Sequence, residues 1–372
     1  MAKQAGSNSF APLPVGSVVG ILGGGQLGRM MAIAANRLGF ITAVLSPRPE
    51  DPAASVAHHH ICNAFDDKTG LAKLAELSDV VTYELEQLPA DTLRWLMARV
   101  PVAPDLRILE IAQDRVREKT FLSSIGISTA TWSAVERKEE LLVALSRIGR
   151  PAVLKVAYGG YDGKGQAMLE QTTTDAEALA AWDHLADGAD MTAIVEEKLD
   201  FEYELSVIVG RSADGNKVAY DPAFNIHKNH ILDTSEVPGP FTPMVAERAK
   251  AIGFKLAEAL ELVGIICLEL FLLPSGELRA NEIAPRPHNS GHWTLDAAHT
   301  DQFEQLVRAA CGLPLGSPTR FIDAVMQNII GEDMAKVPDY LKIPNVKLHL
   351  YGKRDARPGR KMGHVTFLKP SR

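Results

Sequence analysis

A lysine followed by a glycine-rich loop is the segment of this sequence best suited to phosphate chemistry. The apolar run 151–154 predicts a strand that delivers Lys155, and four glycines and a second lysine follow within ten residues. Glycines let backbone N–H groups approach an anion closely, and the lysines add positive charge, which suits a triphosphate. The loop does not match a Walker A motif, because Gly163-Lys164 is followed by Gly165 where that motif has Ser or Thr. The alternative is a flexible surface hairpin.

Two carboxylates in an apolar hairpin predict a metal site. The run 264–273 is interrupted by one charge, Glu269, and after a Pro-Ser-Gly turn the returning strand 278–283 carries Glu282. A turn centred at the Ser-Gly step places the two glutamates directly opposite each other, where like charges repel and lose hydration. A Mg²⁺ ion removes both costs, and the neighbouring Asn281 offers a further oxygen ligand. The alternative is a pair splayed toward solvent.

A second glycine loop lies near the N-terminus. Gly23, Gly25 and Gly28 match the pattern G-x-G-x-x-G between a predicted strand and the predicted helix 29–38. That pattern raises a rival hypothesis, an NAD-dependent oxidoreductase, but the acidic residue expected after the second strand is missing until Glu50. We therefore expect the loop to hold a phosphate at the helix N-terminus. A tight turn without any ligand is the remaining alternative.

Composition and charge exclude several classes of protein. The net charge of −7 argues against bulk attraction to nucleic acid or acidic membranes, and no apolar run reaches membrane-spanning length. Cys62, Cys267 and Cys311 are far apart and show no paired spacing, as in a protein with reduced thiols. The first residues lack the apolar core of a signal peptide. These features predict a soluble protein in the cytoplasm.

The pattern of predicted elements indicates an α/β fold. Buried strands are predicted at 17–22, 40–45 and 79–84, with helices at 29–38 and 90–99. Such alternation predicts a parallel sheet with helices on its faces. After Pro104 the pattern changes to a compact α+β segment that holds the glycine loop, with strands predicted at 193–199 and 201–209.

A basic cluster near the C-terminus predicts a second anion site. Lys353, Arg354, Arg357, Arg360 and Lys361 fall within nine residues, and the Pro-Gly step between them prevents a helical stripe. Predicted strands at 349–351 and 365–367 would anchor this loop at both ends. A loop fixed in this way is better suited to hold a phosphate than a solvated tail, which is the alternative.

The order of these features resembles the ATP-grasp ligases, in which two α+β domains close on ATP. Five segments, in the same order, resemble the 5-(carboxyamino)imidazole ribonucleotide synthase family of purine biosynthesis and cover nearly the whole chain. They are residues 23–30, 81–86, 159–166, 284–294 and 357–364. The segments His-Asn-Ser-Gly-His-Trp-Thr and Arg-Pro-Gly-Arg-Lys are far more specific than the glycine loops.

The resemblance implies a role for particular residues. ATP would be bound by Arg115, Lys155, Gly160, Tyr161, Asp162, Gly163, Lys164, Gly165, Gln166, Glu196, Glu197, Lys198, Leu199, Glu204, His227, Asn281 and Glu282. Among these, Glu196 and the backbone after it would read the adenine edge, and Glu204 would hold the ribose. Mg²⁺ would be held by Glu269 and Glu282. The substrate would be bound by Gly25, Gln26, Leu27, Glu84, Lys353 and Arg360, and Asp162, Arg286, His288 and Asn289 would face the carboxylation centre.

The resemblance also implies an organisation and a reaction. We expect an N-terminal extension (1–17), a Rossmann-like pre-ATP-grasp parallel-sheet domain (18–112), an ATP-grasp lid (113–205), an ATP-grasp C-terminal domain with the metal hairpin (206–318) and a small β-rich C-terminal appendage (319–372). ATP would activate bicarbonate as carboxyphosphate, and the amine of 5-aminoimidazole ribonucleotide would attack it, or CO₂ released from it. The alternative within the fold is a sister ligase that uses formate on glycinamide ribonucleotide. The family suggests a homodimer.

Overall fold

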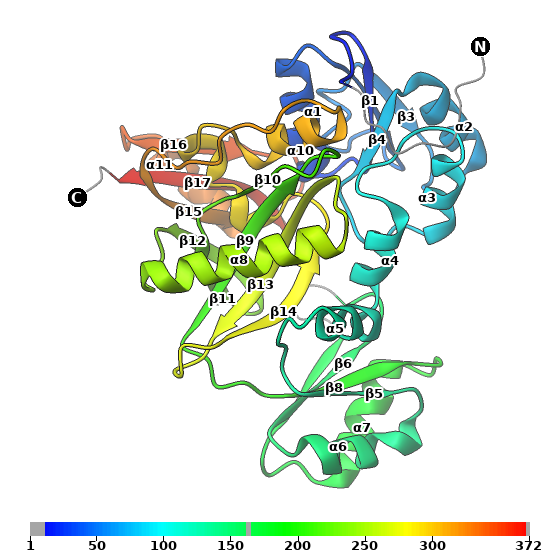
Figure 1. The fold of residues 1–372 in the computed structure, drawn as a ribbon, viewed down its shortest axis with the longest axis vertical. Coiled ribbons are helices and arrows are strands. Elements are labelled where there is room, and N and C mark those ends of the chain that lie inside the picture. Colours follow the sequence, from blue (N-terminus) through cyan, green and yellow to red (C-terminus); the bar gives the residue numbers. More distant parts are fainter. Residues whose placement is uncertain (1–11, 161–164, 370–372) are drawn as a thin grey trace.

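The computed structural model describes residues 12–160 and 165–369, and three sheets organise them (Figure 1). The first sheet is parallel, in the order β3-β2-β1-β4, as the alternating pattern predicted. Its elements are β1 (Val18–Leu22), α1 (Gln26–Arg37), β2 (Ile41–Ser46), β3 (His59–Cys62), α2 (Lys68–Leu77), β4 (Val80–Tyr83), α3 (Ala90–Met97) and α4 (Leu106–Gln113). The loop after β1 and the end of β4 lie at the same edge of this sheet, because parallel strands end together.

The second sheet forms the lid. Its four antiparallel strands have the order β5-β8-β6-β7, and α6 and α7 lie on its outer side, away from the rest of the molecule (Figure 1). The elements are α5 (Arg115–Ser124), which leads into the lid, β5 (Trp132–Val135), η1 (Lys138–Glu140), α6 (Leu141–Ile148), β6 (Ala152–Val156), β7 (Gln166–Leu169), α7 (Asp175–Ala186) and β8 (Ala193–Glu197).

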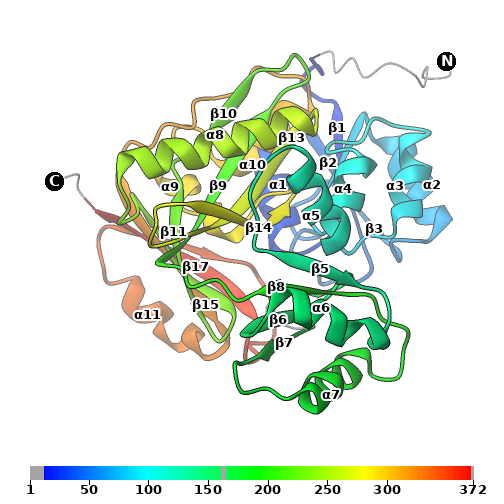
Figure 2. The ribbon, with the colours of Figure 1, turned by 60° about the horizontal axis from the view of Figure 1, so that its bottom comes forward.

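The third sheet has nine strands, eight in the order β14-β13-β9-β11-β12-β15-β17-β16, with β10 beside β9. Its elements are β9 (Tyr203–Arg211), β10 (Lys217–Ala219), β11 (Ala223–Lys228), β12 (Ile231–Val237), α8 (Pro243–Ala259), β13 (Gly264–Leu272), β14 (Leu278–Ala284), η2 (Asn289–Gly291), α9 (Thr294–Ala297), α10 (Gln302–Ala310), β15 (Asp323–Ile330), η3 (Gly331–Lys336), α11 (Val337–Tyr340), β16 (Val346–Leu350) and β17 (Lys361–Lys369). Helix α8 covers one face of β9 and β13, and α10 packs on the opposite face (Figure 2).

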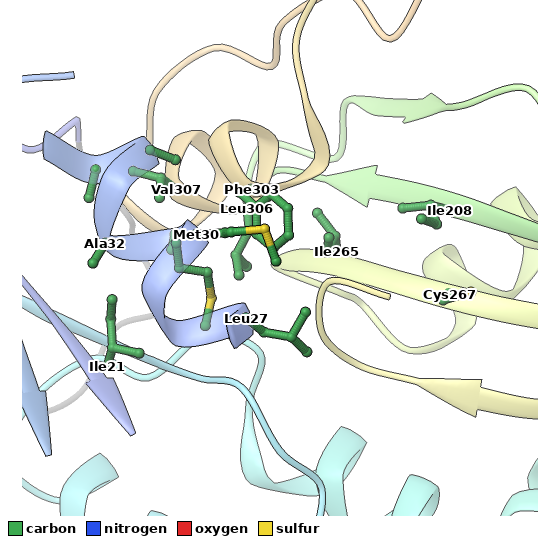
Figure 3. Close-up of a cluster of buried hydrophobic side chains, with 14 of the residues drawn as sticks. Ile21, Leu27, Met30, Ala32, Ile208, Ile265, Cys267, Phe303, Leu306 and Val307 are labelled. Atoms are coloured by element: carbon green, nitrogen blue, oxygen red, sulfur yellow. The ribbon is translucent and has the colours of Figure 1, made fainter. Parts of the chain in front are cut away.

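One hydrophobic core joins the first and third sheets. Leu27 and Met30 of α1 lie against Phe303 and Leu306 of α10, which in turn cover Ile265 of β13 (Figure 3). All five side chains are buried. The lid has a core of its own, and all the described residues of this core lie between positions 135 and 195. The first and third sheets therefore form one packed body, whereas the lid packs as a separate unit.

Three details differ from the sequence predictions. Helix α1 begins at Gln26 and not at residue 29, because Gly25 is its N-cap and residues 26–28 form the first turn of the helix. The predicted boundary at 205 falls inside β9. The C-terminal strands β15 and β17 pair into the large sheet through β12, so the predicted appendage continues that sheet. None of the helices among the described residues is long and apolar enough to cross a membrane.

Candidate active site

A cleft of about 530 Å³ lies where the three sheets meet. The ends of β1 and β4, the lid strand β6, and the face of β9, β11, β13 and β14 all contribute to its walls. Among the residues predicted for the site, its lining contains Gly25, Gln26, Leu27, Glu84, Arg115, Lys155, Gly160, Gly165, Gln166, Glu204, His227, Glu269, Asn281, Glu282, Arg286, His288 and Asn289. The fold thus brings together residues that are up to 264 positions apart in the sequence.

The acidic hairpin contains a bulge that the sequence did not indicate. Strand pairs keep the predicted register as far as Leu268 and Ile283, and then shift by one residue before Leu270. Glu269 therefore faces both Asn281 and Glu282, which differs from the predicted one-to-one pair by the extra residue Asn281. A β-bulge lets two side chains of one strand meet one side chain of its partner. Three oxygen-bearing side chains consequently gather on one face of the hairpin.

The two carboxylates of the hairpin have different electrostatic surroundings. Burial and the nearby charge of Glu282 raise the pKa of Glu269 to about 7. Loss of hydration also acts on Glu282, but Arg115, whose Nη1 lies 3.2 Å from Oε2, and Lys155 hold its pKa below the ordinary value. The charge of Glu282 disfavours a second negative charge on Glu269, and a cation between the two carboxylates would remove this repulsion. The donor set of two carboxylates and one amide oxygen suits a hard divalent ion.

Glu196 is buried and paired with two lysines. Its carboxylate is buried between two ammonium groups, with Lys119 at 2.8 Å and Lys155 at 2.5 Å. Burial alone would raise the pKa of Glu196, but the two lysines hold it at about 2. The carboxylate is therefore paired with both lysines, and its role at the adenine edge stays a prediction. Glu197 is the last residue of β8, and Lys198 and Leu199 follow it. None of the three lines the cleft.

Two consecutive residues of α5 contact the backbone of the acidic hairpin. Strand β14 lies at the edge of the large sheet, so one side of its backbone lacks a strand partner. Glu118 accepts a hydrogen bond from the N–H of Ile283 at 2.6 Å, and Lys119 donates to the carbonyl of Asn281 at 2.8 Å. Both side chains are about 1% exposed. These contacts hold the backbone on either side of Glu282.

The first glycine loop contains a carboxylate of the protein itself. Glu84, just after β4, accepts hydrogen bonds from the N–H of Gly25 and, at 2.6 Å, from that of Gly28. A Cβ atom at Gly25 would lie 2.8 Å from a Glu84 oxygen, so glycine is needed for this approach. Burial raises the pKa of Glu84 although these bonds oppose the shift. The N–H groups of Gln26 and Leu27, in the first turn of α1, have no intrahelical acceptor.

The C-terminal basic loop faces the same region. The ammonium group of Lys353 donates to the carbonyl of Lys361 at 2.7 Å, and burial together with Arg360 lowers its pKa to about 8, although Glu84 acts to raise it. Arg360 itself donates to the carbonyl of Asp355 at 3.0 Å. The lining of the cleft contains Lys361 and neither of the two predicted residues. Lys361 lies in the specific Arg-Pro-Gly-Arg-Lys segment, and this segment could have indicated Lys361 as a site residue from the sequence.

Three residues after β14 form the far wall of the cleft. Arg286 pairs with Glu86 at 2.6 Å, and His288 lies with its Nε2 3.2 Å from Glu269. Both polar atoms of the Asn289 side chain are buried without a hydrogen-bond partner among the described residues. An unsatisfied buried amide is costly, so this one indicates a position that a ligand completes. Tyr161, Asp162, Gly163 and Lys164 of the predicted site lie outside the described residues.

Comparison with known proteins accounts for most of the chain. Residues 17–113 match the model of the ribonucleotide synthetase preATP-grasp domain, residues 120–303 that of the ATP-grasp domain, and residues 324–372 that of the phosphoribosylaminoimidazole carboxylase C-terminal domain. An N5-carboxyaminoimidazole ribonucleotide synthase of Brucella melitensis is 48% identical over 96% of this chain and 98% of its own.

Solved structures agree with this similarity. An ADP complex of an N5-carboxyaminoimidazole ribonucleotide synthetase is 42% identical, with a TM-score of 0.92 over 97% of this chain and 94% of its own. An N5-carboxyaminoimidazole synthase of Aspergillus clavatus, solved with ADP and 5-aminoimidazole ribonucleotide, is 29% identical, with a TM-score of 0.88 over 96% of this chain and 95% of its own.

Proposed function

This chain belongs to the N5-carboxyaminoimidazole ribonucleotide synthase family, and on that premise we propose that it uses ATP and bicarbonate to carboxylate the exocyclic amine of 5-aminoimidazole ribonucleotide. It is an ATP-grasp ligase that forms a C–N bond in purine biosynthesis. The observation that carries the proposal most directly is the convergence on one cleft of the acidic hairpin, Lys155 and the unsatisfied amide of Asn289.

The chemistry explains why these groups lie together. Bicarbonate is a poor electrophile, because hydroxide is a poor leaving group. Transfer of the γ-phosphoryl group of ATP to a bicarbonate oxygen gives ADP and carboxyphosphate, whose phosphate leaves readily when the amine attacks its carbon and loses a proton. Phosphoryl transfer is catalysed by positioning and charge neutralisation more than by a covalent nucleophile. A cleft rich in Lys, Arg and carboxylates meets that requirement.

The residues of the hairpin fit a magnesium ion. The raised pKa of Glu269 reflects repulsion from Glu282 as well as burial, and a divalent cation would relieve the repulsion. Glu269 and Glu282 would hold the ion, with Asn281 beside them. The ion would supply charge neutralisation for the phosphate oxygens of the nucleotide. Arg115 and Lys155 would bind the same phosphates from the lid side, because Arg115 contacts Glu282 and the charge of Lys155 lowers the pKa of Glu282.

The substrate phosphate would lie between the first glycine loop and the basic loop. The N–H groups of Gln26 and Leu27 and the dipole of α1 favour an anion there. Lys353 and Arg360 would add charge, and Lys361, which lines the cleft, joins them. Glu84, held on the glycine loop, would accept from the sugar hydroxyls. Arg286, His288 and Asn289 would face bicarbonate, together with Asp162.

The decisive experiment compares two pairs of substrates. Release of ADP should depend on 5-aminoimidazole ribonucleotide and bicarbonate, and should be absent with glycinamide ribonucleotide and formate. The carbamate product can be trapped with ¹³C-labelled bicarbonate. Activity with the second pair alone would make the chain the sister ligase and would contradict the proposal. The oxidoreductase alternative has lost its basis, because the family is shown and the two glycine-loop N–H groups are bound by Glu84.

Two further expectations are part of the proposal. A homodimer is supported by strand β16, which ends the large sheet and has a described strand partner on one side only, and by the exposed apolar side chains of Leu341, Ile343 and Leu350 around it. Sedimentation at two protein concentrations tests it. A cytoplasmic location is supported by three free cysteines, of which Cys62 is exposed. Fractionation of cells that express the protein tests the location.

A further inference from the structure

A chain of buried hydrogen bonds runs from strand β12 to His288. Ser235 donates to Oδ1 of Asn225 at 2.8 Å, and Nδ2 of Asn225 donates to Oγ of Ser206 at 2.9 Å. Ser206 lies 2.6 Å from Oγ of Ser290, which lies 2.8 Å from Nδ1 of His288. The four residues that lead to the histidine are at most 5% exposed. Four buried polar side chains on four different elements thus form one connected network.

The direction of the hydrogen bonds follows from both ends of the network. At one end, the backbone N–H of Ser290 points at Nδ1 of His288 at 3.4 Å, since His288 caps the short helix η2. This long contact favours a lone pair on Nδ1, and the shorter contact of 2.8 Å with the Ser290 hydroxyl decides which tautomer the ring adopts. Each hydroxyl has one proton to donate, so Ser290 donates to His288, Ser206 donates to Ser290, and Asn225 must offer its NH₂ group to Ser206. Asn225 has this orientation, with its oxygen turned to Ser235.

The contacts of the other ring nitrogen and of the backbone fix the orientation of the ring. Nε2 of His288 lies 3.2 Å from a carboxylate oxygen of Glu269. The backbone of His288 is held as well, because Gln302 accepts from its N–H at 2.9 Å and donates to its carbonyl at 2.8 Å. The ring therefore cannot turn over without breaking contacts on both sides.

We propose that Ser290, Ser206 and Asn225 are positioning residues that keep His288 in the Nε2–H tautomer, so that it serves as a hydrogen-bond donor to the oxygens of bicarbonate. This inference rests on the proposed function for its ligand, but not for the position of the proton. A lone pair on Nδ1, occupied by Ser290, cannot accept a proton from the amine of the substrate. His288 consequently stabilises negative charge on oxygen and is not the base of the reaction.

Histidine NMR on the full chain tests the position of the proton. With ¹⁵N-labelled histidine, the signals of His288 are identified as those that disappear in His288→Gln. We expect Nδ1 in the unprotonated range and Nε2 in the protonated range without any substrate. A protonated Nδ1 in the wild-type protein overturns the inference directly.

An isosteric substitution tests the network at a distance. In Asn225→Asp the carboxylate can only accept, so Ser206 must donate to it, every later bond reverses, and His288 should move to the Nδ1–H tautomer. Ser206→Ala, which breaks the network, should give a mixture of tautomers and covers the case in which the first variant does not fold. Asn328→Asp is the matched control, because Asn328 is equally buried but donates to the carbonyl of Leu232 outside the network.

The kinetic readout separates this inference from the proposed function. In Asn225→Asp, His288 should lose its Nε2–H donor. This loss should lower kcat about a hundredfold, with the KM for MgATP within about twofold of wild type. An unchanged His288 tautomer in both Asn225→Asp and Ser206→Ala would overturn the role of the network. If the wild type has the Nε2–H tautomer but releases no ADP with aminoimidazole ribonucleotide, the proposed function fails while the proton assignment stands.

Discussion

At the residue scale, single charges in and beside the cleft differ most from their behaviour in water. Lys353 illustrates this, because burial and the neighbouring Arg360 lower its pKa to about 8. The protonated form, which would bind a phosphate, exists below that pH and disappears above it. A lysine with an ordinary pKa near 10.4 would stay charged over the same range.

The first prediction uses this property. We expect kcat/KM for the ribonucleotide to fall above about pH 8, with a slope of about one per pH unit, and kcat/KM for MgATP to fall much less. Lys353→Arg should remove this inflection, because an arginine does not lose its proton in this range. Steady-state rates between pH 6.5 and 9.5 measure it. An inflection that persists in the arginine variant would assign the titration to another group.

The acidic hairpin supplies the second prediction. Glu269→Ala should reduce ATP turnover by about a thousandfold or more, since loss of a ligand weakens metal binding and unshields the γ-phosphate. The melting temperature should stay the same or rise in the absence of nucleotide, because a repulsive contact with Glu282 disappears. ADP release and thermal unfolding measure the two effects. Wild-type turnover in this variant would contradict the metal assignment, and Glu277→Ala in the exposed turn is the control.

At the element scale, helix α5 and the edge strand β14 depend on each other. Lys119 contacts the carbonyl of Asn281 and the carboxylate of Glu196, so it connects the large sheet with the lid strand β8. Ion pairs at the surface contribute little, but removing one partner of a buried pair leaves an uncompensated charge. The burial of Lys119, more than its charge alone, therefore determines how much its ion pair contributes to the stability of the protein.

The third prediction compares two lysines with different burial. Lys119→Met should destabilise the protein by about 3–5 kcal/mol, because Glu196 loses one of its two buried partners. Lys138→Met, which removes an exposed pair with Asp183, should change the stability by about 1 kcal/mol or less. Urea unfolding followed by fluorescence measures both. Equal effects of the two substitutions would show that the buried pair has no special weight.

At the scale of the whole molecule, the separate core of the lid has a dynamic consequence. The first and third sheets share buried side chains at α1 and α10, whereas the lid shares none of its core with them. A unit with few buried contacts to its surroundings moves at low free-energy cost. The nucleotide would bind between the lid and the large sheet, so it would restrict this motion.

The fourth prediction follows from that arrangement. In hydrogen exchange measured by mass spectrometry, MgATP should slow exchange in lid peptides from β6 and β7 and leave peptides from α1 and α10 almost unchanged. The non-hydrolysable analogue of ATP should give the same result, which separates binding from turnover. Equal protection of α10 would show that the ligand tightens the whole molecule and that the lid is not a separate unit.

The sequence alone was sufficient to predict local features and the residue types of the site. The strands before both glycine loops, the hairpin that carries Glu269 and Glu282, and the basic loop between two strands were all recognisable, because turns and strand periodicity depend on neighbouring residues. The resemblance of five ordered segments then indicated the family, which the comparisons confirm.

Only the tertiary structure decided which distant residues meet. The bulge that turns Asn281 toward Glu269, the burial of Glu196 between two lysines, and the hydrogen bonds from Ser235 to His288 have no local signal in the sequence. Each depends on strands that pair across long separations and on the loss of water between them. Burial then decides the protonation of the groups enclosed there, and no pattern of neighbouring residues contains that information.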